Sequence, residues 1–289
     1  MNGHVVVKHP RAAWAGLQEP QILVNARLDQ LKGTHSGLSV NQKKERQNLY
    51  DQAKKKFNLD SAIDLIEPLI SEDVLDRMAD LVIEADRTPL LAFPHPGFDD
   101  DDAIDGETPV QPLPANAIPF AFSAILAEQL GIDEDRELIQ SERVGRTKLN
   151  RWLRFLCQPS FDGGVDRDRP YILLDDVVTT GGTLAALRSH IVRSGGRVIA
   201  VSALAHSSGR PFEFPVARAT LDVLLSLYSE GMRALWARKI GHDLEHLTEA
   251  EARTLVDWGE EQRRSGVESG TSLLYALRDR LDEAAAKGR

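Results

Sequence analysis

Residues 171 to 183 read Tyr-Ile-Leu-Leu-Asp-Asp-Val-Val-Thr-Thr-Gly-Gly-Thr, and the expected fold follows from this stretch. Its apolar start suits a buried β-strand, which ends in the adjacent acids Asp175 and Asp176. The Thr-Gly-Gly-Thr loop then opens an amphipathic helix, in which apolar residues recur three and four positions apart. These apolar residues are Leu184, Leu187 and Ile191. We therefore expect one unit of strand, loop and helix.

The glycine-threonine loop at the start of this helix suits a bound phosphate. The first N–H groups of a helix have no partner within the helix and lie at the positive end of its dipole. Gly181 and Gly182 let the backbone approach an anion closely, and Asp175 and Asp176 can accept hydrogen bonds from vicinal sugar hydroxyls. The stretch therefore predicts a sugar-phosphate site. The alternatives are a glycine-rich turn that binds nothing and an acid pair engaged in a salt bridge.

The same stretch resembles the phosphoribosyl-pyrophosphate (PRPP) signature of the type I phosphoribosyltransferase family. That signature has four apolar residues, two acids, two apolar residues and a small Thr/Gly loop, and residues 171–183 conform to it. The resemblance covers about residues 88–206, and from Gly195 through residues 197–205 it is similar to adenine-type members. It implies an α/β fold with a parallel sheet flanked by helices, and a homodimer. It also implies Mg²⁺-dependent transfer of phosphoribose from PRPP to a small nitrogenous acceptor, such as a nucleobase, with release of pyrophosphate.

Site residues carry over from the family to the matching positions of this chain. The resemblance implies that residues 179–183 hold the 5-phosphate. It also implies that Asp175 and Asp176 are the catalytic acids, which hold the ribose hydroxyls and bind Mg²⁺ directly or through water. Oxopurine-salvage members carry an acid in place of Thr179. A threonine cannot act as a general base at neutral pH, so the motif indicates PRPP as the donor but leaves the identity of the acceptor open. The substrate-binding residues expected from the motif are Val177, Val178, Thr179, Thr180, Gly181, Gly182 and Thr183.

Two segments are candidates for contact with the diphosphate of PRPP. After the first core strand the family has a tight loop, and here residues 93–97 read Phe-Pro-His-Pro-Gly, with His95 as the candidate contact. A rigid turn with a surface histidine is the alternative, since two prolines impose a bend in any case. Farther on, Arg143, Arg146 and Lys148 lie where family members carry a mobile loop that reaches the pyrophosphate. A solvated run of charges is the alternative for these three cations.

Hydrophobic patterning divides the chain into three regions. Residues 1–87 are expected to be mostly helical, after a turn-rich and irregular segment to about residue 38. Capping signals at Ser39 and Ser71 open two helices there. Residues 88–212 alternate short apolar runs with helices, which predicts a parallel sheet. The predicted strands of this core are residues 90–93, 137–140, the motif strand and 197–205.

Residues 213–289 are expected to be helical. Apolar residues from Leu221 to Leu235 fall on one helical stripe, which suits a packing or oligomer surface. Thr248 and Glu251 form a capping box for a further helix, and leucines mark a last one. His242 and His246, four residues apart, supply two ligands of the three that a zinc site would need, so a solvated helix end is the favoured interpretation.

Charge and hydropathy bound the class of protein. The 289 residues are 42% hydrophobic with a net charge of −9, and no apolar run is long enough to cross a membrane. Without a signal-peptide pattern at the start, we expect a cytoplasmic location. The net acidity argues against an extended nucleic-acid surface. The feature that would suit nucleic acid is the basic cluster of the N-terminal helix, Lys43, Lys44, Lys54, Lys55 and Lys56.

Two functions fit these patterns. In the first, the chain is a pentosyltransferase that uses PRPP as donor. In the second, the same pocket senses PRPP or a nucleotide without turnover, and the helical regions relay its occupancy to a partner. A scaffold without a ligand is a third option, but it gives no reason for two acids beside an intact phosphate loop.

Overall fold

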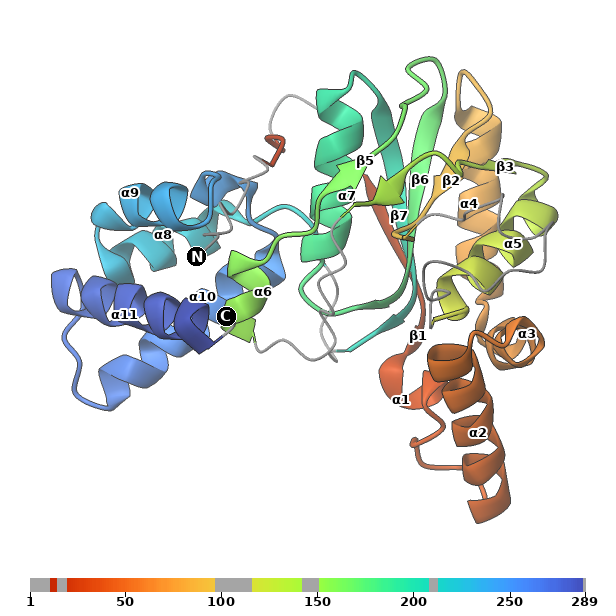
Figure 1. Ribbon diagram of the computed structural model, residues 1–289, viewed down its shortest axis with the longest axis horizontal. Helices are drawn as coiled ribbons and strands as arrows, with labels where there is room; N and C mark the ends of the chain where they lie inside the picture. The colour runs from red at the N-terminus through yellow and green to blue at the C-terminus, as the bar shows by residue number, and fades with distance from the viewer. Residues whose placement is uncertain (1–10, 15–19, 97–115, 142–150, 208–212, 288–289) are drawn as a thin grey trace, which may run out of the picture.

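A five-stranded parallel sheet forms the centre of the computed structural model, which describes residues 11–14, 20–96, 116–141, 151–207 and 213–287. The strand order is β1-β7-β6-β2-β3, and every neighbouring pair is parallel (Figure 1). The strands are β1 (Gln21–Arg27), β2 (Leu90–Ala92), β3 (Asp133–Glu134), β6 (Pro170–Val178) and β7 (Arg197–His206). The predicted α/β class, a parallel sheet flanked by helices, is therefore confirmed.

Helices cover both faces of the sheet. Successive side chains of a strand point to opposite faces, so β6 contributes to two cores. Ile172 and Leu174 belong to a core shared with α4 (Glu72–Glu84) and α5 (Ile118–Leu130). Tyr171 and Leu173 belong to a core shared with α7 (Gly182–Arg193), which lies on the other side of the sheet in Figure 1. Burial on both faces explains why β6 begins as a continuous apolar run.

The motif unit forms as predicted, with one correction. The strand does not end at the two acids, because β6 continues to Val178, which pairs with His206 of β7. Val177 and Val178 are apolar and extend the ladder, so Asp175 and Asp176 lie inside the strand, two to three residues before its carboxyl end. The loop follows, and α7 begins at Gly182.

The N-terminal region contains helices and one strand of the sheet. Its helices are α1 (Leu28–Leu31), α2 (Val40–Lys56), α3 (Leu59–Ile66) and α4, with a 3-10 turn, η1 (Glu67–Leu69), before α4. The capping box of Ser39 with Gln42 at the start of α2 is confirmed. The expectation of an irregular segment to residue 38 is wrong, because residues 21–27 form β1 and pair with β7. The sheet therefore draws a strand from outside the predicted core of residues 88–212, and the three-region division itself stays a prediction.

Residues 137–140 do not join the parallel sheet, contrary to the prediction. Ile139 and Gln140 form β4, which pairs with β5 (Phe161–Asp162) in a separate antiparallel ladder. The edge of the main sheet is β3 instead. Between β3 and β4, the carboxylate of Asp135 accepts hydrogen bonds from the N–H groups of Glu137 (2.9 Å) and Leu138 (3.2 Å), which turns the chain away from the sheet.

The C-terminal region is helical, as predicted, and packs as a unit with α6. Its elements are α8 (Arg218–Tyr228), α9 (Gly231–Lys239), η4 (Leu244–His246), α10 (Glu249–Arg264) and α11 (Thr271–Lys287), which enclose a core with Trp152 of α6 (Arg151–Leu156). The single stripe from Leu221 to Leu235 is split between α8 and α9, because Ser229 takes a φ of 66° and ends the first helix. The capping box of Thr248 with Glu251 is confirmed. Within the described ranges, each helix is too short or too polar to cross a bilayer.

Candidate functional site

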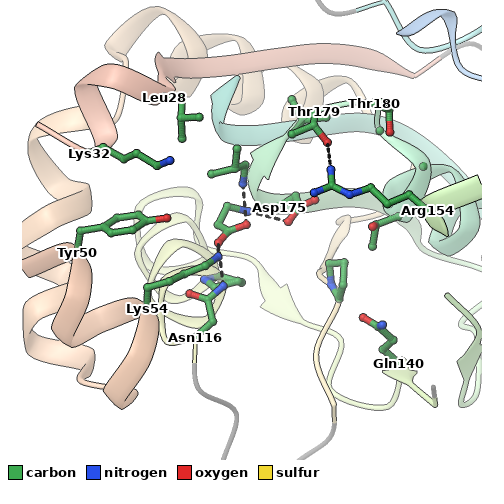
Figure 2. A pocket seen from close by; sticks show the side chains of 18 residues that line it. Leu28, Lys32, Tyr50, Lys54, Asn116, Gln140, Arg154, Asp175, Thr179 and Thr180 are labelled. Carbon is green, nitrogen blue, oxygen red and sulfur yellow. Dashed lines mark hydrogen bonds and ion pairs between the residues drawn. The ribbon is translucent and has the colours of Figure 1, made fainter. Parts of the chain in front are cut away.

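A cavity of about 410 Å³ lies at the carboxyl ends of the parallel strands. Ligands of open α/β sheets bind at this edge, where loops after neighbouring strands diverge. The loop between β6 and α7 forms one wall, and α1 and α2 form the opposite one (Figure 2). The lining residues are Leu28, Lys32, Tyr50, Lys54, Pro94, Asn116, Pro119, Gln140, Arg154, Asp175, Asp176, Val177, Val178, Thr179, Thr180, Gly181, Gly182 and Thr183. All nine residues expected from the motif stretch are thus brought to one cavity.

The loop of residues 179–183 has the backbone of an anion-binding helix start. Gly181 is the N-cap of α7 with a φ of 75°, a left-handed conformation that favours glycine. The N-cap Gly181 makes no side-chain capping bond, and Gly181, Gly182 and Thr183 at the start of α7 all line the cavity. The guanidinium of Arg154 lies 3.5 Å from the Thr179 hydroxyl and adds positive charge beside the loop.

Asp176 is buried and has three internal partners. Its carboxylate accepts hydrogen bonds from Asn116 Nδ2 (2.8 Å) and from the N–H of Val177 (2.7 Å), and it forms an ion pair with Lys54. Burial opposes ionisation of Asp176, but the charge and hydrogen bond of Lys54 outweigh it, so the pKa of Asp176 is lowered. The salt bridge considered from the sequence as an alternative for the acid pair therefore exists at Asp176.

Asp175 behaves in the opposite way. Burial and then the charge of Asp176 raise the pKa of Asp175 well above its ordinary value. Its Oδ1 accepts a hydrogen bond from the N–H of Asp176 (2.9 Å), and part of the side chain stays open to the cavity. Asp176 is therefore the ionised member of the pair, and Asp175 is the member that takes up a proton first.

Residues of the N-terminal helices complete the site, and sequence analysis assigned none of them to it. Lys32, Tyr50 and Lys54 line the wall opposite the loop of residues 179–183, and in Figure 2 their side chains extend toward the cavity. Burial raises the pKa of the Tyr50 phenol, and Asp176 raises the pKa of Lys54 although burial opposes this. Tyr50 and Lys54 are four residues apart and share one face of α2, which was the available signal.

The predicted contacts to the diphosphate are placed differently. His95 is buried outside the cavity lining, with its ring centroid 4.9 Å from that of Phe93 and 5.9 Å from that of Phe120. His95 is therefore not a surface histidine and does not line this cavity, and its contact with a diphosphate stays a prediction. Burial lowers the pKa of His95, and its neighbour Pro94 lines the cavity instead. Arg143, Arg146 and Lys148 lie outside the described residues.

The residues of the acid pair do not suit a directly bound Mg²⁺ in this arrangement. Mg²⁺ takes oxygen ligands, and the ammonium of Lys54 occupies the approach to the Asp176 carboxylate. Among the described residues, no cluster of three or more His, Cys, Asp or Glu side chains is placed to hold a metal ion. His242 and His246, whose rings are 6.3 Å apart, do not form the solvated helix end expected from the sequence, because His242 is buried and precedes η4, which begins at Leu244.

Comparisons with known proteins give relatives in sequence and weak matches in structure. No protein-family model matches the chain. It is 30% identical over 201 residues to Protein TraN of Escherichia coli, which covers 70% of this chain and 41% of that protein. It is 32% identical over 145 residues to an uncharacterized protein of Haemophilus influenzae, covering 50% of this chain and 29% of that protein. The chain thus spans less than half the length of these curated relatives.

Adenine phosphoribosyltransferases are among the solved structures that match. The one from Leishmania donovani has a TM-score of 0.28 and 17% identity, over 50% of this chain and 56% of that chain. The one from Thermoanaerobacter pseudethanolicus has a TM-score of 0.25 and 15% identity, over 46% of this chain and 79% of that chain. Likenesses at these scores support no inference about the function of this chain.

Proposed function

We propose that this chain binds PRPP and transfers its phosphoribose to a nitrogenous acceptor with release of pyrophosphate. The observation that carries the proposal is the placement of the phosphate loop and both acids of the motif on one cavity, at the carboxyl edge of a parallel sheet. Cytoplasmic location and a homodimer remain part of the proposal as predictions.

Each wall of the cavity would have a separate task. The N–H groups of residues 180–183 would hold the 5-phosphate, since a helix start with a left-handed glycine favours an anion. Asp175 and Asp176 would hold the ribose hydroxyls. The acceptor would enter between the ribose and α2, beside Lys32 and Tyr50, because these residues form the wall across from the loop.

The reaction requires the protein to hold the ribose and the 5-phosphate in fixed positions and does not require a covalent bond to the protein. A nitrogen of the acceptor forms a bond to C1 of the ribose, while the bond from C1 to the pyrophosphate oxygen breaks and leaves its electron pair on pyrophosphate. The proton that the acceptor nitrogen loses passes to solvent. The ionised Asp176 and the phosphate loop would hold the ribose between them while positive charge develops on it. The acid pair does not suit a directly bound Mg²⁺ here, and a Mg²⁺ ion held through water stays a prediction.

The test combines binding with turnover. Asp175→Asn with Asp176→Asn should weaken PRPP binding in calorimetry by about 1 to 3 kcal/mol, the scale of buried charge-assisted hydrogen bonds. Asp222→Asn, which alters an exposed acid on α8, is the control and should bind as the wild type does. Pyrophosphate release on addition of a base from a broad panel would establish transfer. Wild-type affinity in the double variant would refute the role of the acids.

A second candidate, a PRPP or nucleotide sensor, is favoured by the pair of Lys54 and Asp176. A ribose hydroxyl can reach the Asp176 carboxylate only by sharing it with Lys54 or displacing it, and Lys54 belongs to α2. Ligand binding would therefore act directly on an N-terminal helix. PRPP binding that changes amide exchange in α2, without pyrophosphate release for any base of the panel, would select the sensor over the transferase.

A further inference from the structure

Two buried groups from outside the motif hold the backbone carbonyls of the phosphate loop. The hydroxyl of Thr248, at the start of α10, donates a hydrogen bond to the carbonyl of Thr180 (2.5 Å). The guanidinium of Arg11 donates to the carbonyl of Gly182 (3.4 Å). Both residues are shielded from solvent, at 0% and 4% exposure. The loop that lines the cavity is thus supported from behind by the C-terminal region and by the start of the described chain.

These contacts act on the N–H groups that would face a phosphate. In a trans peptide unit the C=O and the following N–H point in opposite directions. Fixing the carbonyl of Thr180 therefore fixes the N–H of Gly181, and fixing the carbonyl of Gly182 fixes the N–H of Thr183. An anion site made of backbone N–H groups depends on such orientation, because each N–H must already point at the ligand before it binds.

A buried carboxylate joins the two supports. Glu251 forms a two-pronged ion pair with Arg11, with Nη1 2.5 Å from Oε2 and Nη2 2.8 Å from Oε1, and it accepts a hydrogen bond from the N–H of Thr248 (3.0 Å). The charge of Arg11 outweighs the effect of burial and lowers the pKa of Glu251. Arg11 also donates to Gln158 Oε1 (2.8 Å) after α6. Four segments far apart in the sequence therefore meet behind the loop.

Helix capping alone does not account for Thr248. As N-cap of α10, its hydroxyl oxygen accepts a hydrogen bond from the N–H of Glu251 (3.1 Å), and an acceptor is all that the cap requires. The cap does not use the hydroxyl proton of Thr248, which is donated to the carbonyl of Thr180. The capping box that the sequence indicates thus has a second contact on the site.

We infer that Thr248, together with Arg11 and Glu251, is a positioning residue for the phosphate loop, so that affinity for a sugar phosphate depends on the C-terminal region. The inference rests on the proposed function for the identity of the ligand. The orientation of the loop amides does not depend on the identity of the ligand, and amide exchange without ligand measures it separately.

The experiment uses the full chain and two readouts, amide hydrogen exchange of residues 179–184 without ligand and calorimetric affinity for PRPP. Thr248→Val removes the hydroxyl, Thr248→Ser retains it, and Thr254→Val is the matched control. Thr254 lies in the same helix, and its hydroxyl donates within α10 to the carbonyl of Ala250 (2.8 Å). Asn58→Ala, which removes the N-cap of α3, controls for the loss of a helix cap.

Thr248→Val should speed exchange of the loop amides and weaken PRPP binding about tenfold, as expected for the loss of one buried hydrogen bond. Thr248→Ser should restore both readouts to near wild type, and the two controls should change neither. Wild-type exchange and affinity in Thr248→Val would overturn the inference. If Thr248→Val does not fold, Arg11→Lys keeps a charge facing Glu251 without the planar fork, and unchanged loop exchange in it would overturn the inference equally. Faster loop exchange in Thr248→Val, with no PRPP binding by the wild type, would reject the proposed function and keep the positioning role.

Discussion

Replacing Lys54 by methionine should destabilise the protein at pH 7 and do so less at acid pH. Lys54 and Asp176 form an ion pair whose side chains are only 23% and 10% exposed. Removing one partner of a buried pair costs about 3 to 5 kcal/mol, because the other charge is left without compensation. Asp176 would keep its hydrogen bonds from Asn116 and from the N–H of Val177, so we expect the lower end, about 3 kcal/mol.

The pH dependence follows from the direction of the shift at Asp176. Its pKa is lowered in the folded state, so the pair stabilises the wild type above the unfolded pKa of about 3.9. That stabilisation is lost as the pH falls through the lower, folded pKa. In Lys54→Met the lowering is absent, so the difference in unfolding free energy between wild type and variant should be full at pH 7 and should shrink toward pH 3.

Urea denaturation followed by tryptophan fluorescence at several pH values measures this difference. Lys55→Met is the matched control, because Lys55 is the next residue of α2 and pairs with Asp51 on the surface at 67% exposure. An exposed pair of this kind contributes about 0 to 1 kcal/mol. A loss below about 1 kcal/mol in Lys54→Met, or a loss that does not shrink between pH 7 and about pH 3, would refute the reasoning.

Three further changes test the site and the region next to it. Asp175→Asn should leave the stability at pH 7 unchanged or raise it, because the raised pKa of Asp175 means that the folded protein disfavours its charged form. PRPP affinity should fall in the same variant. A clear loss of stability in urea would contradict this. Gly181→Ala should cost about 1 to 2 kcal/mol of stability, because the left-handed φ of 75° strains a side chain, and an unchanged melting temperature would argue against that conformation. Gly259→Ala should destabilise the C-terminal core by about 1 to 3 kcal/mol, because its Cβ would lie 2.7 Å from the Tyr228 hydroxyl and 3.0 Å from the ring carbon Cζ. Tyr228→Phe removes the nearer contact and should relieve part of the loss, and fully additive losses in the double variant would contradict the clash.

Elements that depend on neighbours in the chain could be predicted from the sequence. The unit of β6, loop and α7 has its apolar period, its glycines and its acids within residues 171–191, so local pattern and turn chemistry suffice. The capping boxes at Ser39 and Thr248 are complete within four residues and were predicted for the same reason. By contrast, β1 follows a turn-rich stretch, and the residues of β7 that pair with it lie 179 positions further along the chain, as Gln21 with Ala200 shows.

The parts of the site that the sequence did not reveal are long-range contacts. Lys54 and Asp176 are 122 residues apart, and Asn116 and Asp176 are 60 apart, so no local pattern joins them. Lys54 was grouped with the other lysines of α2 as a basic cluster, yet the helix turns Lys54 into the cavity while Lys55 stays on the surface. At the break the positive φ falls on Ser229 and not on Gly231, which lies two residues on, so the apolar period predicts one stripe where the structure has two helices.

The two ends of the cavity are controlled from different parts of the chain, and this bears on the choice between transferase and sensor. Behind the phosphate loop, Thr248 and Arg11 are buried and hold carbonyls that a bound phosphate would not touch, so this end can stay fixed through a catalytic cycle. At the sugar end, Lys54 occupies the same carboxylate that a ribose hydroxyl would use, so this end must change when ligand binds. A transferase needs the change to be small and to precede the bond-making step, whereas a sensor needs it to move α2. The response of α2 to PRPP, measured beside turnover, therefore separates the two functions more sharply than affinity does.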